Sequence, residues 1–251
     1  MPSNSFDCCV TSPPYWFGRD NGHPRQIGLE FWPGDYIADL VSVFSEVRRV
    51  LNRRGTLWIN IGDCFCTRKM VKPSRRRADE GRRWADASAL GLTMLPSRLA
   101  PYGIKEGDLL LSWELAAALR TEGWYFRSHV TRVKTRATPD PADRPRRISE
   151  PVLMLTTSQR GYHYTPQPGC ETDVWTLPPA KGHAQHSSMM PLELARHCLL
   201  IGSPPGGRVL DPFGGLGTTC GAAKAAGRSA RCIEINPAYA KEARRLMAEP
   251  D

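Results

Sequence analysis

Two consecutive prolines, at positions 13 and 14, follow directly on an apolar run at residues 6–10 and constrain the fold more than any other feature. The run predicts a central strand, because it alternates little and is bounded by turn residues. Neither proline can donate a backbone N–H, so the chain must turn sharply. This proline turn (residues 12–16) presents the Ser12 hydroxyl, bare carbonyls and the Tyr15 ring where α/β sheets bind ligands. Together the hydroxyl, the carbonyls and the aromatic ring suit the binding of a flat ring that carries an amine. The alternative interpretation of these residues is a Pro-rich surface loop after an edge strand.

A glycine-rich segment near the other end of the chain has the composition of a cofactor-binding turn. A short strand at residues 208–210 precedes this glycine turn (residues 211–217), and a helix of small residues follows at 220–226. The glycines let the backbone approach a ligand closely, and the helix start offers unpaired N–H groups. A second strand at 229–235 ends near Glu234, where such sheets place the acid that binds a ribose diol. The predicted cofactor residues are Asp211, Pro212, Phe213, Gly214, Gly215, Gly217, Thr218 and Glu234.

The spacing of apolar residues between the two turns predicts an alternation of strands and helices. Residues 17–33 are irregular and are expected to form a lid over the proline turn. Asn236 and Pro237 are expected to cap and start a final basic amphipathic helix that ends near Ala248. The remaining predicted helices are at 35–51, 108–122 and 191–201, and the remaining predicted strands are at 56–61, 124–133 and 151–157.

Composition points to a polyanionic partner. The 251 residues carry a net charge of +9 with a pI near 9.3, which favours binding to DNA or RNA. No apolar run approaches the roughly 20 residues of a membrane span, and the N-terminus lacks a basic-then-apolar signal pattern. We therefore expect a cytoplasmic protein without membrane contact.

Eight cysteines occur without a Cys-x-x-Cys pair. Several lie inside apolar strand or helix patterns, so we expect all of them to be reduced, buried small side chains. Cys170, His183 and His186 are the only loosely clustered candidate metal ligands. Their spacing matches no zinc signature, and no metal is expected.

Residues 64–107 interrupt the strand–helix alternation and are predicted to be an insertion into a domain formed by residues 1–63 and 108–251. The first half of the insertion is rich in arginine and lysine, which is often no more than a solvated loop. We favour instead a DNA-contacting or target-recognition region, because such an insertion leaves the sheet at the end where ligands bind. The predicted DNA-binding residues are Arg75, Arg76, Arg77, Arg82, Arg83 and, outside the insertion, Lys134.

The Ser12-Pro13-Pro14-Tyr15 sequence combined with residues 211–219, Asp-Pro-Phe-Gly-Gly-Leu-Gly-Thr-Thr, resembles the β class of amino-directed DNA methyltransferases. The resemblance implies a Rossmann-like α/β sheet that binds S-adenosyl-L-methionine. It also implies a circularly permuted order, with the catalytic motif before the cofactor motif. Two positions depart from the class, which usually has an aromatic residue where this chain has Arg132 and often a histidine where it has Ser149.

The resemblance implies methyl transfer to the exocyclic amine of a base flipped out of double-stranded DNA. The Ser12 hydroxyl and the Pro13 carbonyl would accept hydrogen bonds from the amine, with Pro14 shaping the turn and Tyr15 stacking on the base. Asp211 would orient the methionine amino group of the cofactor, and Glu234 would bind its ribose. Serine at the first motif position favours cytosine N4. Adenine N6, an RNA base and a catalytically silent DNA-binding relative are the alternatives.

Members of this class normally begin with a further strand and a Gly-Asp element whose acid meets the adenine amino group of the cofactor. This chain starts almost at the first strand. We therefore expect either a homodimer that covers the sheet edge at residues 232–235 or a loop that does so. The sequence does not indicate whether a restriction endonuclease accompanies the protein in a restriction–modification system.

Overall fold

A computed structural model of the chain describes residues 1–16, 23–30, 32–63, 111–134, 145, 148–177 and 190–248. The predicted insertion and its five DNA-binding arginines lie outside the described residues, as do His183, His186 and part of the expected lid. In chain order the elements are β1 (Phe6–Thr11), α1 (Pro33–Val50), β2 (Leu51–Asn60), α4 (Leu111–Thr121), β3 (Tyr125–Lys134), β4 (Ser149–Thr156), β5 (Val174–Leu177), α5 (Leu192–Gly202), β6 (Arg208–Asp211), α6 (Thr218–Ala225), β7 (Ser229–Cys232) and α7 (Pro237–Ala248).

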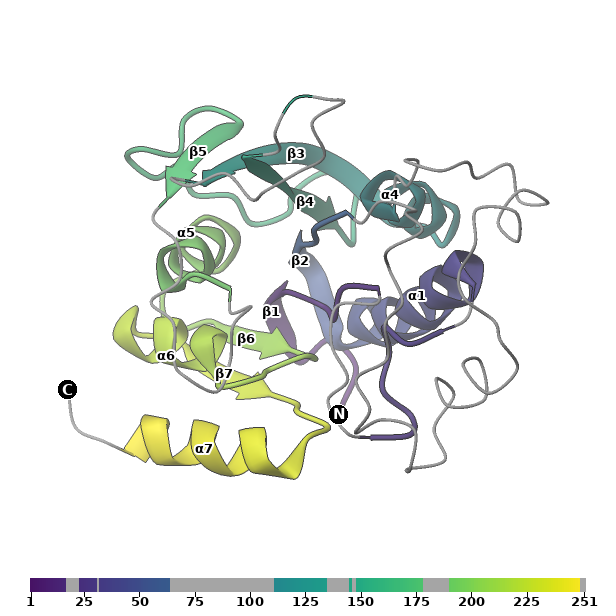
Figure 1. Cartoon of the computed structure of the whole chain (residues 1–251). Coiled ribbons are helices and arrows are strands. Elements are labelled where there is room, and N and C mark those ends of the chain that lie inside the picture. Colours follow the sequence, from purple (N-terminus) through teal and green to yellow (C-terminus); the bar gives the residue numbers. More distant parts are fainter. Residues whose placement is uncertain are drawn as a thin grey trace, which may run out of the picture.

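The strands form one seven-stranded sheet in the order β5-β3-β4-β2-β1-β6-β7 (Figure 1). β1 pairs in parallel with β2 and β6, and β6 pairs in parallel with β7. β4 is antiparallel to both β2 and β3, and β5 is parallel to β3. Every strand except β4 therefore ends at the same edge of the sheet, and β4 begins there. This carboxyl edge receives both the proline turn and the glycine turn.

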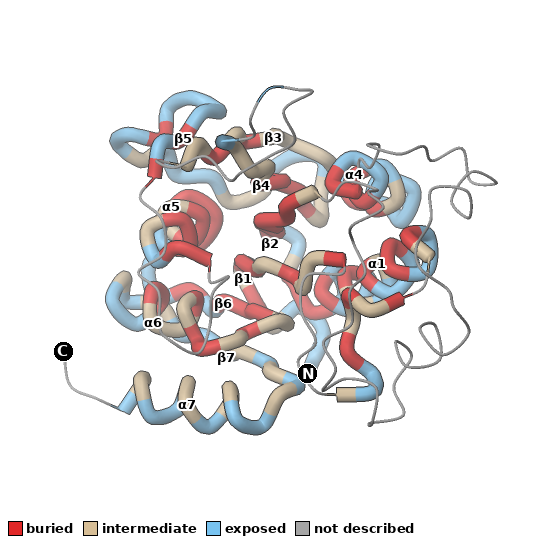
Figure 2. The backbone as a smooth tube through the Cα atoms, in the orientation of Figure 1, coloured by how far each residue is buried: buried red, intermediate tan, exposed pale blue. Residues whose placement is uncertain are grey.

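Helices cover both faces of the sheet, in keeping with the predicted Rossmann-like class (Figure 1). α1 and α4 pack on one face over Leu57, Ile59 and Leu155. α5 and α6 pack on the other face over Val10, Trp58 and Val209. Figure 2 shows the two buried layers and the contrast with α7, which has no buried residue.

Most predicted elements are confirmed with ends shifted by a few residues. β5 is the exception, because four residues in a segment without periodicity give no strand signal. β7 is shorter than expected and ends at Cys232, so Glu234 lies beyond the strand. The Asn236 side chain accepts the Ala238 N–H at 2.9 Å, which confirms the predicted start of α7.

The prediction that all cysteines are reduced is wrong for one pair. Cys220 on α6 and Cys232 on β7 form a disulfide, with their Cα atoms 6.5 Å apart. The pairing arises because α6 packs directly on β7, which brings together two positions 12 residues apart in sequence. Cys8, Cys9, Cys170 and Cys198 are free and buried, as predicted.

The described helices include none that is long and apolar enough to cross a membrane. Within the described ranges, no three His, Cys, Asp or Glu side chains gather as a metal site.

Candidate active site

The proline turn is held from two sides. On α1, the buried Tyr36 hydroxyl donates to the Pro14 carbonyl oxygen at 2.9 Å. In the loop at 23–30, the Glu30 carbonyl oxygen accepts the Trp16 indole N–H at 2.9 Å. Trp16 is 1% exposed and therefore anchors the turn from inside the protein. The turn is a fixed element rather than a loose surface loop.

Tyr15 lies against the end of β2. A Cβ atom added to Gly62 would be 2.6 Å from Tyr15 Cε2, so glycine is required there for the ring to occupy its place. Burial raises the pKa of the Tyr15 phenol, while hydrogen bonds from the Ser12 side chain and the Gly62 backbone oppose that rise. Ser12 and Tyr15, both predicted catalytic residues, therefore contact each other at the carboxyl edge.

Asp211 organises the glycine turn from inside. It is 3% exposed, and its Oδ1 accepts hydrogen bonds from the Phe213 N–H at 3.0 Å and the Thr11 hydroxyl at 2.6 Å. Its Oδ2 accepts the Thr219 hydroxyl at 2.7 Å. Burial raises the pKa of this carboxyl group, and the three donors counteract that effect. Through these three hydrogen bonds the Asp211 carboxylate fixes the conformation of the glycine turn.

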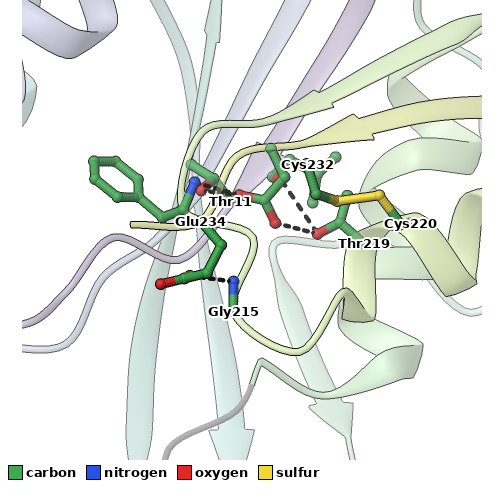
Figure 3. The surroundings of a disulfide bond; sticks show 9 residues. Thr11, Gly215, Thr219, Cys220, Cys232 and Glu234 are labelled. Carbon is green, nitrogen blue, oxygen red and sulfur yellow. Dashed lines mark hydrogen bonds between the residues drawn. A yellow bond between two sulfur atoms is a disulfide. The ribbon is translucent and has the colours of Figure 1, made fainter. Parts of the chain in front are cut away.

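Glu234 closes the glycine turn from the β7 side. Its carboxylate accepts the Gly215 N–H at 2.8 Å and the Asn236 N–H at 2.7 Å. Figure 3 shows Glu234 beside Gly215, with the Cys220–Cys232 disulfide to one side of them, next to Thr219. Ile233 and Ile235, on either side of Glu234, are 44% and 39% exposed. Glu234 is thus placed by backbone donors rather than by burial.

The other predicted cofactor residues complete the turn. The rings of Phe213 and Phe44, the latter on α1, form a T-shaped contact with centroids 6.4 Å apart. Gly217 has φ +84°, a conformation that favours glycine, and serves as the N-terminal cap residue of α6. Thr218 then begins the helix.

Thr11 joins the two turns and was not predicted from sequence. It ends β1 immediately before Ser12, and its hydroxyl bonds Asp211 across 200 positions of sequence. The signal available was a hydroxyl at the end of an otherwise apolar strand. Because β1 and β6 are neighbours in the sheet, this bond fixes the proline turn next to the glycine turn. The arrangement can hold a flat amino-bearing ring beside a nucleoside cofactor.

Lys134, predicted to contact DNA, ends β3 at the same edge. Its ammonium group pairs with Glu150, and its side chain is 22% exposed. Glu150 also pairs with the buried Arg132, one of the two positions that depart from the methyltransferase class.

Comparison with known proteins agrees with this geometry. A family model described as DNA methylase, N6_N4_Mtase, matches residues 6–245. The chain belongs to this DNA methylase family. Among its relatives, the type II methyltransferase M.SmaI of Serratia marcescens is 38% identical over 259 residues, covering 97% of this chain and 85% of the relative. The type II methyltransferase M.Cfr9I of Citrobacter freundii is 38% identical, covering 95% and 80%.

Solved structures of DNA methylases share the fold. The PvuII DNA methyltransferase (cytosine-N4-specific) superposes with a TM-score of 0.72 at 14% identity, covering all of this chain and 82% of that one. TTHA0409 of Thermus thermophilus, solved in complex with S-adenosyl-L-methionine, gives a TM-score of 0.66 at 27% identity, with coverages of 99% and 87%.

Proposed function

We propose that this DNA methylase is a type II methyltransferase that moves a methyl group from S-adenosyl-L-methionine to the N4 amine of cytosine in double-stranded DNA. The observation that carries the proposal is the 2.6 Å hydrogen bond between Thr11 and Asp211, which couples the proline turn to the glycine turn. The names of M.SmaI and M.Cfr9I support the type II assignment. The complex of TTHA0409 supports the cofactor.

The residues of the glycine turn fit this cofactor. Glu234 lies at the carboxyl edge beside Gly215, where it can accept hydrogen bonds from ribose hydroxyls while its backbone donors hold it in place. Asp211 acts on the methionine end directly, through water or through the turn it shapes. When bound, the cofactor supplies an electrophilic methyl group on its sulfonium.

The proline turn supplies the acceptors. The lone pair of an exocyclic amine is delocalised into the ring. The amine nitrogen must therefore become tetrahedral, with its lone pair localised, before it can attack a methyl carbon. The Ser12 Oγ and the Pro13 carbonyl oxygen accept hydrogen bonds from the amine and stabilise that geometry. Tyr15 stacks on the base once it has left the helix, and Tyr36 keeps Pro14 from moving as it does so.

Cytosine N4 is favoured over adenine N6 by Ser12 and by the cytosine-N4 specificity of the structurally similar PvuII enzyme. Adenine N6 is the second candidate, because the DNA adenine methyltransferase YhdJ of Escherichia coli strain K12 is 26% identical over 96% of this chain. A catalytically silent relative is disfavoured by the intact contacts of Ser12, Tyr15 and Asp211.

The proposed function also covers DNA contacts, location in the cell and assembly. The basic insertion at 64–107 and Lys134 would contact DNA phosphates, the protein would act in the cytoplasm, and a homodimer would form at the β7 edge.

Incubation of the purified protein with labelled S-adenosyl-L-methionine and unmodified genomic DNA, followed by nucleoside mass spectrometry, tests the reaction. We expect label in N4-methylcytosine. Label in N6-methyladenine alone would establish the second candidate, and cofactor binding without any labelled nucleoside would establish the silent relative.

A further inference from the structure

A buried charge cluster lies on β3 and β4 at the carboxyl edge. The Arg132 guanidinium donates to Glu150 Oε2 at 2.7 Å, and the other carboxylate oxygen pairs with Lys134. The Arg132 and Glu150 side chains are only 6% and 14% exposed. Two cations and one anion leave one positive charge in excess. The Arg132 Nε–H is buried and has no hydrogen-bond acceptor among the residues that the structure describes.

The cluster adjoins the proline turn. The Pro151 carbonyl oxygen, next to Glu150, accepts hydrogen bonds from Asn60 Nδ2 at 3.2 Å and from the Ile61 N–H at 3.3 Å. The following residue of that segment, Gly62, touches the Tyr15 ring. The charges of Glu150 and Arg132 both influence the pKa of the Tyr15 phenol in the proline turn, Glu150 raising it and Arg132 lowering it.

The fold gives no reason to bury these charges. On the same strands and the same face, two residues further from the edge, Val130 and Val152 are apolar and belong to the core beneath α5. Taking charges out of water is costly unless they are fully paired. Among the described residues the excess positive charge and the unpaired donor have no acceptor, which favours an acceptor-rich partner at the edge. A flipped base offers such acceptors, because it has just lost its Watson–Crick partner.

We propose that Arg132, held by Glu150 and flanked by Lys134, reads the ring acceptors of the flipped base and selects cytosine. This inference rests on the proposed function. Beside its amine cytosine presents N3 and then O2, two neighbouring acceptors that suit the planar fork of a guanidinium group. Adenine presents N1 beside its amine and then only a C–H group. Arg132 is thus a specificity-determining residue that contacts the substrate.

Arg132→Gln tests the proposal, with Arg127→Gln as a matched control on the same strand. Arg127 lies at the opposite end of β3, where its Nε–H bonds Thr156 Oγ1 and its guanidinium lies over the rings of Tyr125 and Tyr162. The readouts are the Kd for S-adenosyl-L-methionine by calorimetry and kcat/KM on a duplex carrying the sequence that the parent methylates. We expect kcat/KM for Arg132→Gln to fall about 10- to 100-fold with unchanged cofactor Kd. The control should retain both values, and Arg132→Lys should not rescue activity, because lysine lacks the fork.

Unchanged kcat/KM in Arg132→Gln would overturn the inference. A variant that keeps kcat but binds every duplex more weakly, with a shallower salt dependence, would identify a phosphate contact and also overturn it. If Arg132→Gln no longer binds cofactor, the double variant Arg132→Met/Glu150→Met replaces the ion pair by apolar groups of similar size. Loss of methylation with cofactor binding intact in that variant supports the inference, and retained methylation overturns it. A parent that makes no N4-methylcytosine would instead overturn the proposed function itself.

Discussion

At the scale of single residues, the candidate site depends on polar side chains that fix the conformation of two backbone turns, and less on solvent-exposed side chains. Asp211 is buried with three donors, and the proline turn is held by the Tyr36 hydroxyl on one side and by the Glu30 carbonyl oxygen, which accepts the Trp16 indole N–H, on the other. Each removes freedom from the turn before any ligand binds. Such preorganisation is where the rate enhancement of a group transfer comes from, because the geometry need not be acquired during the reaction.

Ser12→Ala is predicted to lower kcat about 100-fold or more while leaving the Kd for S-adenosyl-L-methionine unchanged. The lost hydroxyl acts on the amine as it becomes a nucleophile, so the deficit belongs to the transition state. Steady-state kinetics measure kcat, and calorimetry measures the Kd. Near-normal turnover would remove Ser12 from the catalytic group.

Gly62→Ala is predicted to lower kcat on the order of 10- to 100-fold, because its Cβ would displace the Tyr15 ring. Gly34→Ala on α1 is the matched control, since a Cβ atom there meets nothing within 4 Å. Steady-state kinetics on both variants, with thermal unfolding to confirm folding, provide the comparison. Equal activity of the two variants would mean that the position of Tyr15 does not matter.

At the scale of elements, the β6–α6–β7 unit holds the glycine turn that we propose binds the cofactor, and the Cys220–Cys232 disulfide links its helix to its last strand. β7 has only four residues at the sheet edge, and its first three are exposed. So short an edge strand buries little surface of its own. The covalent link therefore holds in place the strand whose continuation positions Glu234.

Reduction of the disulfide is predicted to lower the free energy of unfolding by about 2–4 kcal/mol, because the unfolded chain regains the freedom of the closed loop. Denaturant unfolding with and without a thiol reductant measures the change. The double variant Cys220→Ser/Cys232→Ser is the control and should not respond to the reductant. If the parent is equally insensitive, the two cysteines do not stabilise the fold as a pair.

At the scale of the whole molecule, the sheet ends on one side in a short strand with exposed apolar residues beside it. β7 is its last strand, Ile233 and Ile235 are exposed beside it, and no residue of α7 is buried. An exposed strand edge with apolar neighbours is a surface for pairing with another chain. Symmetric pairing of two copies would cover both edges at once.

The protein is therefore predicted to be a dimer at micromolar concentration, and Ile233→Glu/Ile235→Glu should convert it to a monomer. Light scattering gives the mass of each species, and calorimetry gives the cofactor Kd in parallel. A parent protein that is monomeric and still binds S-adenosyl-L-methionine tightly would exclude dimerisation as the way in which this edge is covered.

The sequence by itself determined the local features. Prolines at 13 and 14 end a strand because they lack N–H groups, glycines permit the tight turn at 211–217, and apolar spacing locates the long helices. These three features could be predicted because each depends only on residues that are neighbours in sequence. Only the tertiary structure decided what meets at the carboxyl edge. The Thr11–Asp211 bond, the Arg132–Glu150 pair, the Cys220–Cys232 disulfide and the pairing of β5 all join segments whose proximity depends on strand order and register. Hydrophobic periodicity fixes which side of an element is buried but not which element it meets, so these contacts could not be read from the chain alone.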